Sequence, residues 1–110
     1  HGNSTADMLS RLETMVLSGS TMPLEAIRQQ ISSAIDIIIH LSRFRDRTRK
    51  VVEIVEVTDC KEGIIGLNPL FEFREKDGST PERVEGCLVR TGNPVKNLSK
   101  FRMAGINEVV

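Results

Sequence analysis

Four side chains of this sequence could take part in nucleophilic, acid–base or metal chemistry, namely His1, His40, Cys60 and Cys87. A cysteine beside a histidine can react as a thiolate, and the same residue types bind zinc when they cluster. Neither cysteine has a histidine at zinc-site spacing, and no C-x-x-C or H-E-x-x-H motif occurs. The motifs G-x-S-x-G, G-x-G-x-x-G and G-x-x-x-x-G-K-S/T are absent as well. We therefore do not expect a complete catalytic site within these residues.

His1 differs from the other three because it heads the stretch His1-Gly2-Asn3-Ser4, directly before a predicted helix start. Ser4 can cap that helix by accepting the backbone N–H of Asp7. A helix N-terminus has free N–H groups and the positive end of the dipole, so this stretch can face an anion. The competing interpretation is that His1 is a chain end without function. His40, beside an apolar stripe, is expected to be a hydrogen-bonded core or boundary residue.

Another feature that could take part in binding is the basic cluster Arg43–Lys50, which contains five cations and one acidic residue. Cations are favoured at a helix C-terminus by the helix dipole, so the cluster is interpreted as a solvated helix end and loop. The alternative is a contact with phosphate or with a partner protein.

Two helices are expected to come first in the chain. Apolar residues at helical spacing predict a helix from Ser4 to Val16, which Gly19 ends in a left-handed conformation. A second, longer helix is predicted from Pro23 to Leu41, with Ile37 and Ile39 adding apolar surface outside its stripe.

From Val51 onward the pattern becomes that of an antiparallel meander. Strands are predicted at 51–58, 64–67, 70–74 and 83–90, with turns at 59–63 and 76–81 and an interruption at Asn68-Pro69. A short helix capped by Asn93 and stopped by Gly105 closes the chain. The predicted fold is α/β, a single domain over residues 1–110 with two helices, an antiparallel strand meander and a short terminal helix.

The composition narrows the classes of partner. Hydrophobic residues make up 39% of the 110 residues, which is ordinary for a soluble globular protein. Fifteen basic residues balance fifteen acidic ones, so neither nucleic acid nor an anionic membrane is expected as the main partner, and no direct membrane insertion is expected. The most apolar stretch, Ile35–Leu41, is too short to span a bilayer. Two cysteines allow one disulfide, but reduced thiols in a cytosolic protein are the preferred interpretation.

The opening residues His1–Val16, HGNSTADMLSRLETMV, resemble the so-called His box and following helix of the secretion ATPase superfamily. Within that superfamily, which includes type II and type IV secretion ATPases, the sequence is most similar to the tight-adherence (Flp pilus) ATPases. Further similarity lies in the stretches PLEAIRQQI at 23–31, VEIVEV at 52–57 and LNPLFEF at 67–73. A Thr91-Gly92 turn and a short closing helix complete it.

The resemblance implies that the chain is the C-terminal part of a RecA-like ATPase, whose phosphate-binding loop would lie upstream. Such a parent would use ATP and Mg²⁺, work as a homo-hexamer with an inner-membrane platform protein, and lie at the cytoplasmic face of that membrane. It would power pilus assembly or protein secretion. The resemblance makes His1 the nucleotide-sensing residue, with Asn3 and Ser4 as neighbours, and Arg11 matches an arginine of the family's helix. The chain alone is expected to be inactive and to bind no cofactor.

Two other classes of function compete with this expectation. One is a stand-alone interaction module whose long helix and hairpins bind a partner protein. The other is a small independent enzyme, which has only the two cysteines and two histidines in its favour. We also expect the isolated chain to self-associate in order to cover the apolar surface of the long helix.

Overall fold

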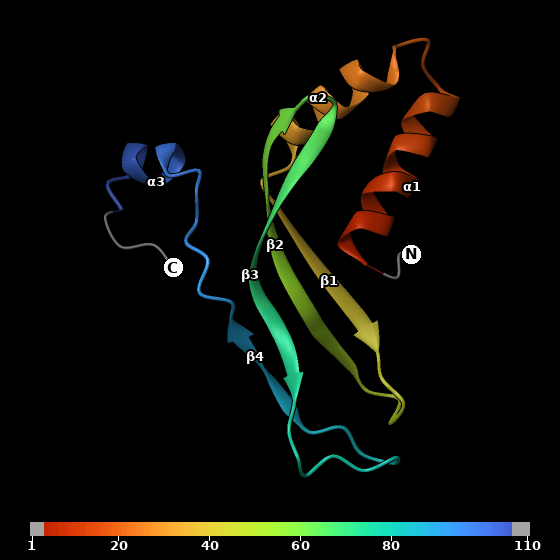
Figure 1. The fold of residues 1–110 in the computed structure, drawn as a ribbon, viewed down its shortest axis with the longest axis vertical. Helices are drawn as coiled ribbons and strands as arrows, with labels where there is room; N and C mark the ends of the chain where they lie inside the picture. Colours follow the sequence, from red (N-terminus) through yellow and green to blue (C-terminus); the bar gives the residue numbers. More distant parts are fainter. Residues whose placement is uncertain (1–3, 107–110) are drawn as a thin grey trace.

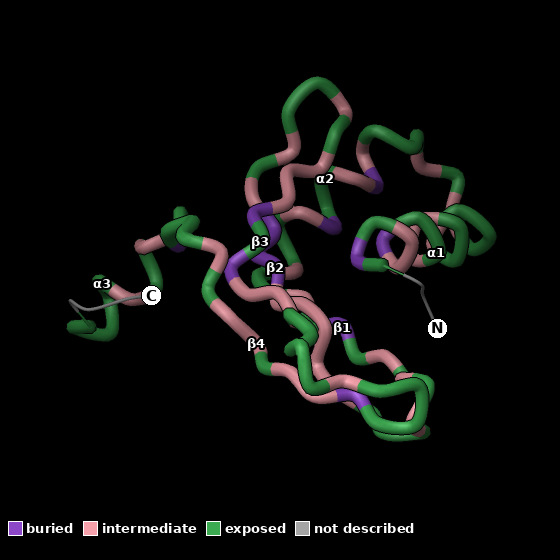
Figure 2. Tube along the Cα trace, turned by 60° about the horizontal axis from the view of Figure 1, so that its bottom comes forward, coloured by how far each residue is buried: buried purple, intermediate pink, exposed green. Residues whose placement is uncertain are grey.

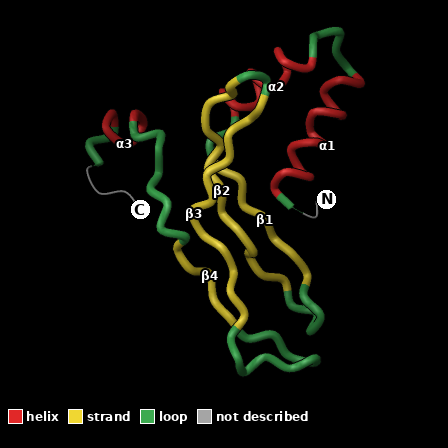
Figure 3. The backbone as a smooth tube through the Cα atoms, in the orientation of Figure 1, coloured by secondary structure: helices red, strands yellow, loops and turns green. Residues whose placement is uncertain are grey.

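In the computed structural model, which describes residues 4–106, two helices precede a four-stranded sheet and a short helix follows it (Figures 1 and 3). The elements are α1 (Thr5–Ser18), α2 (Leu24–Ala34), β1 (Ile37–Arg43), β2 (Arg49–Lys61), β3 (Ile64–Glu75), β4 (Gly86–Arg90) and α3 (Ser99–Met103). Every neighbouring pair of strands is antiparallel, in the order β1-β2-β3-β4. The predicted mixture of helices with an antiparallel meander is confirmed. No helix within residues 4–106 has the length and apolar character needed to cross a bilayer.

The core lies where α1 and α2 pack against the sheet. Leu9 of α1 is buried with Ile27 and Ile31 of α2, and partly buried aliphatic residues of β1 and β3 pack against this cluster. Each such side chain contributes about 1.5–3 kcal/mol when fully buried. Figure 2 shows buried positions on the middle of the sheet and on the adjoining parts of both helices. In Figure 1, α1 and α3 lie on either side of the sheet.

The boundaries of α1 agree with the prediction, but its C-terminus does not adopt the expected conformation. Ser4 is the N-cap, and the helix ends at Ser18. Gly19 has a φ of −111°, so the predicted left-handed glycine is wrong. The Gly19 N–H donates to the Val16 carbonyl at 3.2 Å, a tightened last turn that any residue can form.

The prediction of one long helix to Leu41 is wrong, because α2 ends at Ala34 and the chain becomes β1 at Ile37. Ile35 already has extended dihedrals, φ −106° and ψ 127°. The run of β-branched isoleucines favours a strand, and alternate residues of β1 face opposite sides of the sheet. Ile37 and Ile39, which lie outside the predicted helical stripe, are on the exposed face of this strand.

The basic cluster Arg43–Lys50 is therefore not a helix end but the hairpin between β1 and β2. The Phe44 N–H donates to the Thr48 carbonyl at 2.8 Å, and Arg47 takes a left-handed φ of 68°. This is the arrangement of a type I turn followed by a residue in the left-handed region. Arg43 and Arg49 occupy directly opposite positions in the two strands.

The hairpin between β2 and β3 is tighter than predicted. Lys61 pairs with Ile64, so the turn consists of Glu62 and Gly63 alone. Both have positive φ, 53° and 75°, as a type I′ turn requires. The expected break at Asn68-Pro69 does not end β3, which continues to Glu75. It appears instead as a bulge beside Pro69, where the pairing register with β2 shifts.

The last helix begins later than predicted, at Ser99 rather than after Asn93. The Asn93 side chain donates to the Pro69 carbonyl at 2.9 Å, so it is bonded to β3 and does not cap a helix. The predicted stop is confirmed: Gly105 has a φ of 75°, and the Ile106 N–H donates to the Phe101 carbonyl at 2.8 Å. This bond and the left-handed Gly105 close α3 as a Schellman motif.

Candidate functional site: the first turn of α1 and its contacts with the sheet

The N-terminus of α1 carries the predicted site. Ser4 has extended dihedrals, φ −158° and ψ 169°, and its Oγ accepts the Asp7 N–H at 3.1 Å. The predicted N-cap is therefore confirmed, since this bond satisfies one of the free donors of the first turn. His1 and Asn3 lie outside the described residues.

Thr5 joins this first turn to the centre of the sheet. Its backbone N–H and its hydroxyl both donate to Oε1 of Glu53 on β2, at 3.0 Å and 2.5 Å. Thr5 is buried, with only 3% of its surface exposed. The anion that the helix N-terminus faces is thus a carboxylate of the protein itself, which suits the positive end of the helix dipole.

His40 completes the cluster from the neighbouring strand. It lies opposite Glu53 in the β1–β2 register, and its Nδ1 is 3.5 Å from Oε1 of Glu53. His40 is buried, as predicted, although it stands on a strand rather than on a helix. Burial raises the pKa of Glu53, but the hydrogen bonds from Thr5 and the interaction with His40 outweigh it and hold that pKa below its ordinary value. Glu53 is therefore an ionised carboxylate at neutral pH.

Arg11, the last of the predicted site residues, lies on the exposed surface of α1. Its Nε is 3.1 Å from the Asp7 carboxylate one turn earlier, and 59% of its side chain is exposed. An exposed pair at this spacing stabilises a helix by only about 0.3–0.5 kcal/mol. The structure thus places Ser4 and Arg11 on the same helix, with Arg11 held by Asp7.

Sequence reasoning missed the partnership of Thr5, Glu53 and His40. The available signal was Glu53 itself, a carboxylate that interrupts the alternation of an otherwise β-branched strand. A charged residue in such a place has to find hydrogen-bond donors. The predicted helix over residues 37–41 places His40 on a helix, whereas in the structure it lies on β1 opposite Glu53.

The residues that favoured an independent enzyme are not brought together. Cys60 lies near the β2–β3 turn and Cys87 lies on β4, whereas His40 lies beside Glu53. Both cysteines are free thiols, Cys60 half-buried and Cys87 exposed. Within residues 4–106, no three His, Cys, Asp or Glu side chains are grouped so as to hold a metal ion.

A second hydrogen-bonded carboxylate, that of the buried Glu56, holds the C-terminal segment on the other face of the sheet. It accepts the backbone N–H groups of Lys96 and Asn97 at 2.9 Å and 3.0 Å, and the Asn68 side chain at 3.0 Å. Burial raises the pKa of Glu56, but these three hydrogen bonds lower it by more than burial raises it, so the pKa lies below its ordinary value. Beside it lies an apolar cleft of about 690 Å³, lined by residues that include Ile37, Ile54, Phe71 and Phe101.

Comparison with known proteins adds no family to this description. No protein-family model matches the chain, and no curated protein matches it. Any assignment of function therefore depends on the residues and contacts given above.

Proposed function

We propose that this chain is the C-terminal segment of a hexameric, RecA-like ATPase that powers pilus assembly or protein secretion at the cytoplasmic face of the inner membrane. The residues that carry the proposal are those of the opening stretch, His1 to Val16, whose resemblance to the His box was described above. The structural observation that supports it best is the joint between Thr5 and Glu53.

The hydrogen bonds between Thr5 and Glu53 connect the opening stretch mechanically to strand β2. A His box would have to convert the presence of a nucleotide phosphate into movement of the subunit. The first turn of α1 is bonded to β2 through two hydrogen bonds to one carboxylate oxygen, so a displacement of the residues before Thr5 would be passed to the sheet. Hydrogen bonds to an ionised group are about twice as strong as neutral ones, which makes the joint stiff.

The described residues do not fit a complete site for ATP and Mg²⁺. The N–H groups of Thr5 and Asp7 are already committed to Glu53 and Ser4. The negative charge of Glu53 beside this turn also opposes a second anion there. In the proposal, the nucleotide is held by the phosphate-binding loop of the parent protein. This chain contributes sensing through His1 with its sequence neighbours Asn3 and Ser4, and Arg11 is the arginine that matches the family's helix.

The experiment that tests this function uses the longer protein encoded by the same reading frame. Its ATP hydrolysis is compared with that of His1→Ala and of Thr5→Val, which removes the hydroxyl donated to Glu53. Both variants should lower kcat with little change in nucleotide affinity, because the proposed role is coupling rather than binding. Met103→Ala, at a position that is 88% exposed on α3, is the matched control and should retain the parent activity.

Two results would contradict the proposal. One is a reading frame without a phosphate-binding loop upstream of His1. The other is a longer protein that hydrolyses ATP at the same rate with and without His1. A titration of the 110-residue chain with Mg-ATP, followed by backbone amide shifts, checks the separate expectation that the chain alone does not bind nucleotide.

A second candidate, a protein-interaction module, is favoured by the exposed face of β1. Ile37, Ile39 and Leu41 alternate on this edge strand and are 44%, 52% and 59% exposed. An edge strand with free backbone groups and an apolar face is a common docking surface for an added strand. A pull-down in which Ile39→Lys abolishes capture of a partner, with ATP hydrolysis absent from the longer protein, would favour this candidate.

A further inference from the structure

Two charged residues occupy backbone conformations that their side chains do not favour. Within residues 4–106, Arg47 and Glu62 are the non-glycine residues with positive φ, at 68° and 53°. A residue with a Cβ costs about 1–2 kcal/mol in the left-handed region, a cost that glycine avoids. One is a cation and the other an anion, and they stand in the turns at the two ends of β2. Strain kept at such positions is a reason to look for function there.

The turn that contains Arg47 is a rigid cationic surface. Arg45 bonds the Glu75 carboxylate at 2.6 Å, and Asp46 accepts the Val84 N–H at 2.8 Å, so this hairpin is fixed to the next turn of the sheet. Its remaining cations, Arg43, Arg47, Arg49 and Lys50, form no ion pair with any side chain of residues 4–106. Like charges directly opposite in a ladder are destabilising, and Arg43 faces Arg49. An external anion would relieve that repulsion.

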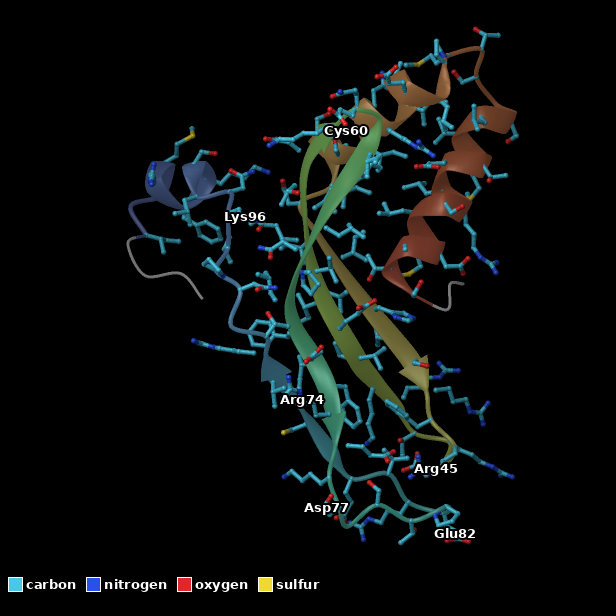
Figure 4. The ribbon with its side chains drawn as sticks, viewed as in Figure 1. Arg45, Cys60, Arg74, Asp77, Glu82 and Lys96 are labelled. Carbon is cyan, nitrogen blue, oxygen red and sulfur yellow. The ribbon has the colours of Figure 1, made fainter. Side chains whose placement is uncertain are left out.

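The turn at the opposite end of β2 carries two exposed carboxylates, those of Asp59 and Glu62. The exposed Lys61 lies between them in the sequence, and the half-exposed Arg28 is paired with Glu13. The end is held together because Arg28 of α2 donates to the Gly63 carbonyl at 2.9 Å. In Figure 4, Cys60 marks this upper end and Arg45 marks the basic hairpin at the lower end.

We propose that these two ends are the complementary halves of a head-to-tail contact between two copies of this chain. The turn containing Arg47 in one copy would receive the turn containing Glu62 of the next. Guanidinium groups suit carboxylates because they can donate two parallel hydrogen bonds. A contact between different surfaces of identical chains is heterologous and generates a ring when its rotation closes. The ring geometry rests on the proposed hexamer, but the contact itself does not.

A small acidic surface fits this hairpin better than an extended polyanion does. The acidic residues Asp77 and Glu82 lie at the same end of the molecule (Figure 4) and would repel a nucleic acid or an anionic membrane. The one aromatic residue of the hairpin, Phe44, packs against Phe73 with ring centroids 4.9 Å apart, so it is engaged within the sheet. The carboxylates of Asp59 and Glu62 belong to one tight hairpin and form a much smaller acidic surface than a polyanion does.

The test is sedimentation velocity of the 110-residue chain over a range of concentrations at low and high salt, without nucleotide. Association should weaken as salt rises, whereas association through apolar surface would not. Arg43→Glu with Arg49→Glu, and separately Asp59→Lys with Glu62→Lys, should each raise the dissociation constant by about tenfold or more. Arg74→Glu, an exposed arginine on β3 outside the hairpin, is the matched control and should associate as the parent chain does.

The decisive measurement is a mixture of the two charge-reversed variants. In each variant the two ends carry charges of the same sign, so each should remain monomeric alone, but the two together should associate. Circular dichroism of each variant checks that it is folded. A parent chain that stays monomeric at low salt overturns the proposal. So does association that survives reversal of the hairpin, and so does a monomer whose hairpin binds phosphatidylglycerol vesicles or single-stranded DNA. Since no step involves ATP, failure here leaves the proposed ATPase function to its own experiment.

Discussion

Glu53 and Glu56 stand on the same strand, β2, and bind segments on opposite faces of the sheet. Glu53 accepts the backbone N–H of Thr5 in α1, and Glu56 accepts those of Lys96 and Asn97 before α3. Successive side chains of a strand point to alternate faces, so an odd and an even position reach opposite sides. The two carboxylates therefore fasten both ends of the described chain to one central strand.

Glu53→Gln should lower the free energy of unfolding by about 1–3 kcal/mol. The substitution removes the charge that Thr5 and the helix N-terminus bind, and an ionised acceptor is worth more than a neutral one. Urea unfolding followed by circular dichroism measures the change. Glu72→Gln is the control, because Glu72 forms an exposed pair with Arg74 and should change stability by less than about 1 kcal/mol. Equal effects of the two substitutions would contradict the role given to Glu53.

Glu56→Gln should release the segment that leads to α3. The Lys96 and Asn97 N–H groups bind different oxygens of the carboxylate, Oε1 and Oε2. In glutamine one of these positions becomes an NH₂ group, which donates and cannot accept, so one of the two bonds is lost. Hydrogen exchange at these two amides should become faster, while exchange within α1 remains at the parent rate. Glu82→Gln, in an exposed turn, serves as the control. Unchanged protection at both amides would show that other contacts hold the segment.

Stability should decrease as the pH falls below about 5, because three carboxyl groups titrate at lower pH in the folded chain than in the unfolded one. Asp46 has its pKa lowered from 3.8 to about 2 by the hydrogen bonds from the Thr48 hydroxyl and the Val84 N–H. The pKa values of Glu53 and Glu56 are also lowered, from 4.5. A carboxyl group whose pKa is lower in the folded chain than in the unfolded one stabilises the fold fully when the pH is above its unfolded pKa. That stabilisation is lost as the pH falls through its folded pKa.

The stabilisation that ionised Asp46 provides should be lost between about pH 4 and about pH 2. Urea midpoints measured at intervals between neutral pH and pH 2 should show the decline. Asp46→Asn cannot titrate, so its stability should depend less steeply on pH below pH 4. Parallel curves for the parent chain and this variant would mean that Asp46 does not contribute to the decline.

How far the sequence predicts this structure depends on whether local signals agree with tertiary contacts. Ser4 and Gly105 were placed correctly because capping and termination depend on nearby backbone groups. Residues 37–41 fit a helical stripe and a β-branched strand equally well, and pairing with β2 decides for the strand. The bonds from Thr5 to Glu53 and from Lys96 to Glu56 join residues far apart in the sequence, so no local pattern could reveal them.

Glu62→Asn should stabilise the chain by about 0.5–1 kcal/mol. Glu62 and Gly63 form the two central positions of a type I′ turn, both with positive φ, and Asn-Gly is the pair that this turn favours. Asparagine tolerates the left-handed region better than glutamate does. Gly63→Ala is the counterpart: an added Cβ would meet no atom within 4 Å, so its cost of about 1–2 kcal/mol would come from the backbone conformation alone. Thermal unfolding of both variants measures the pair, and a stabilising Gly63→Ala would contradict the turn type.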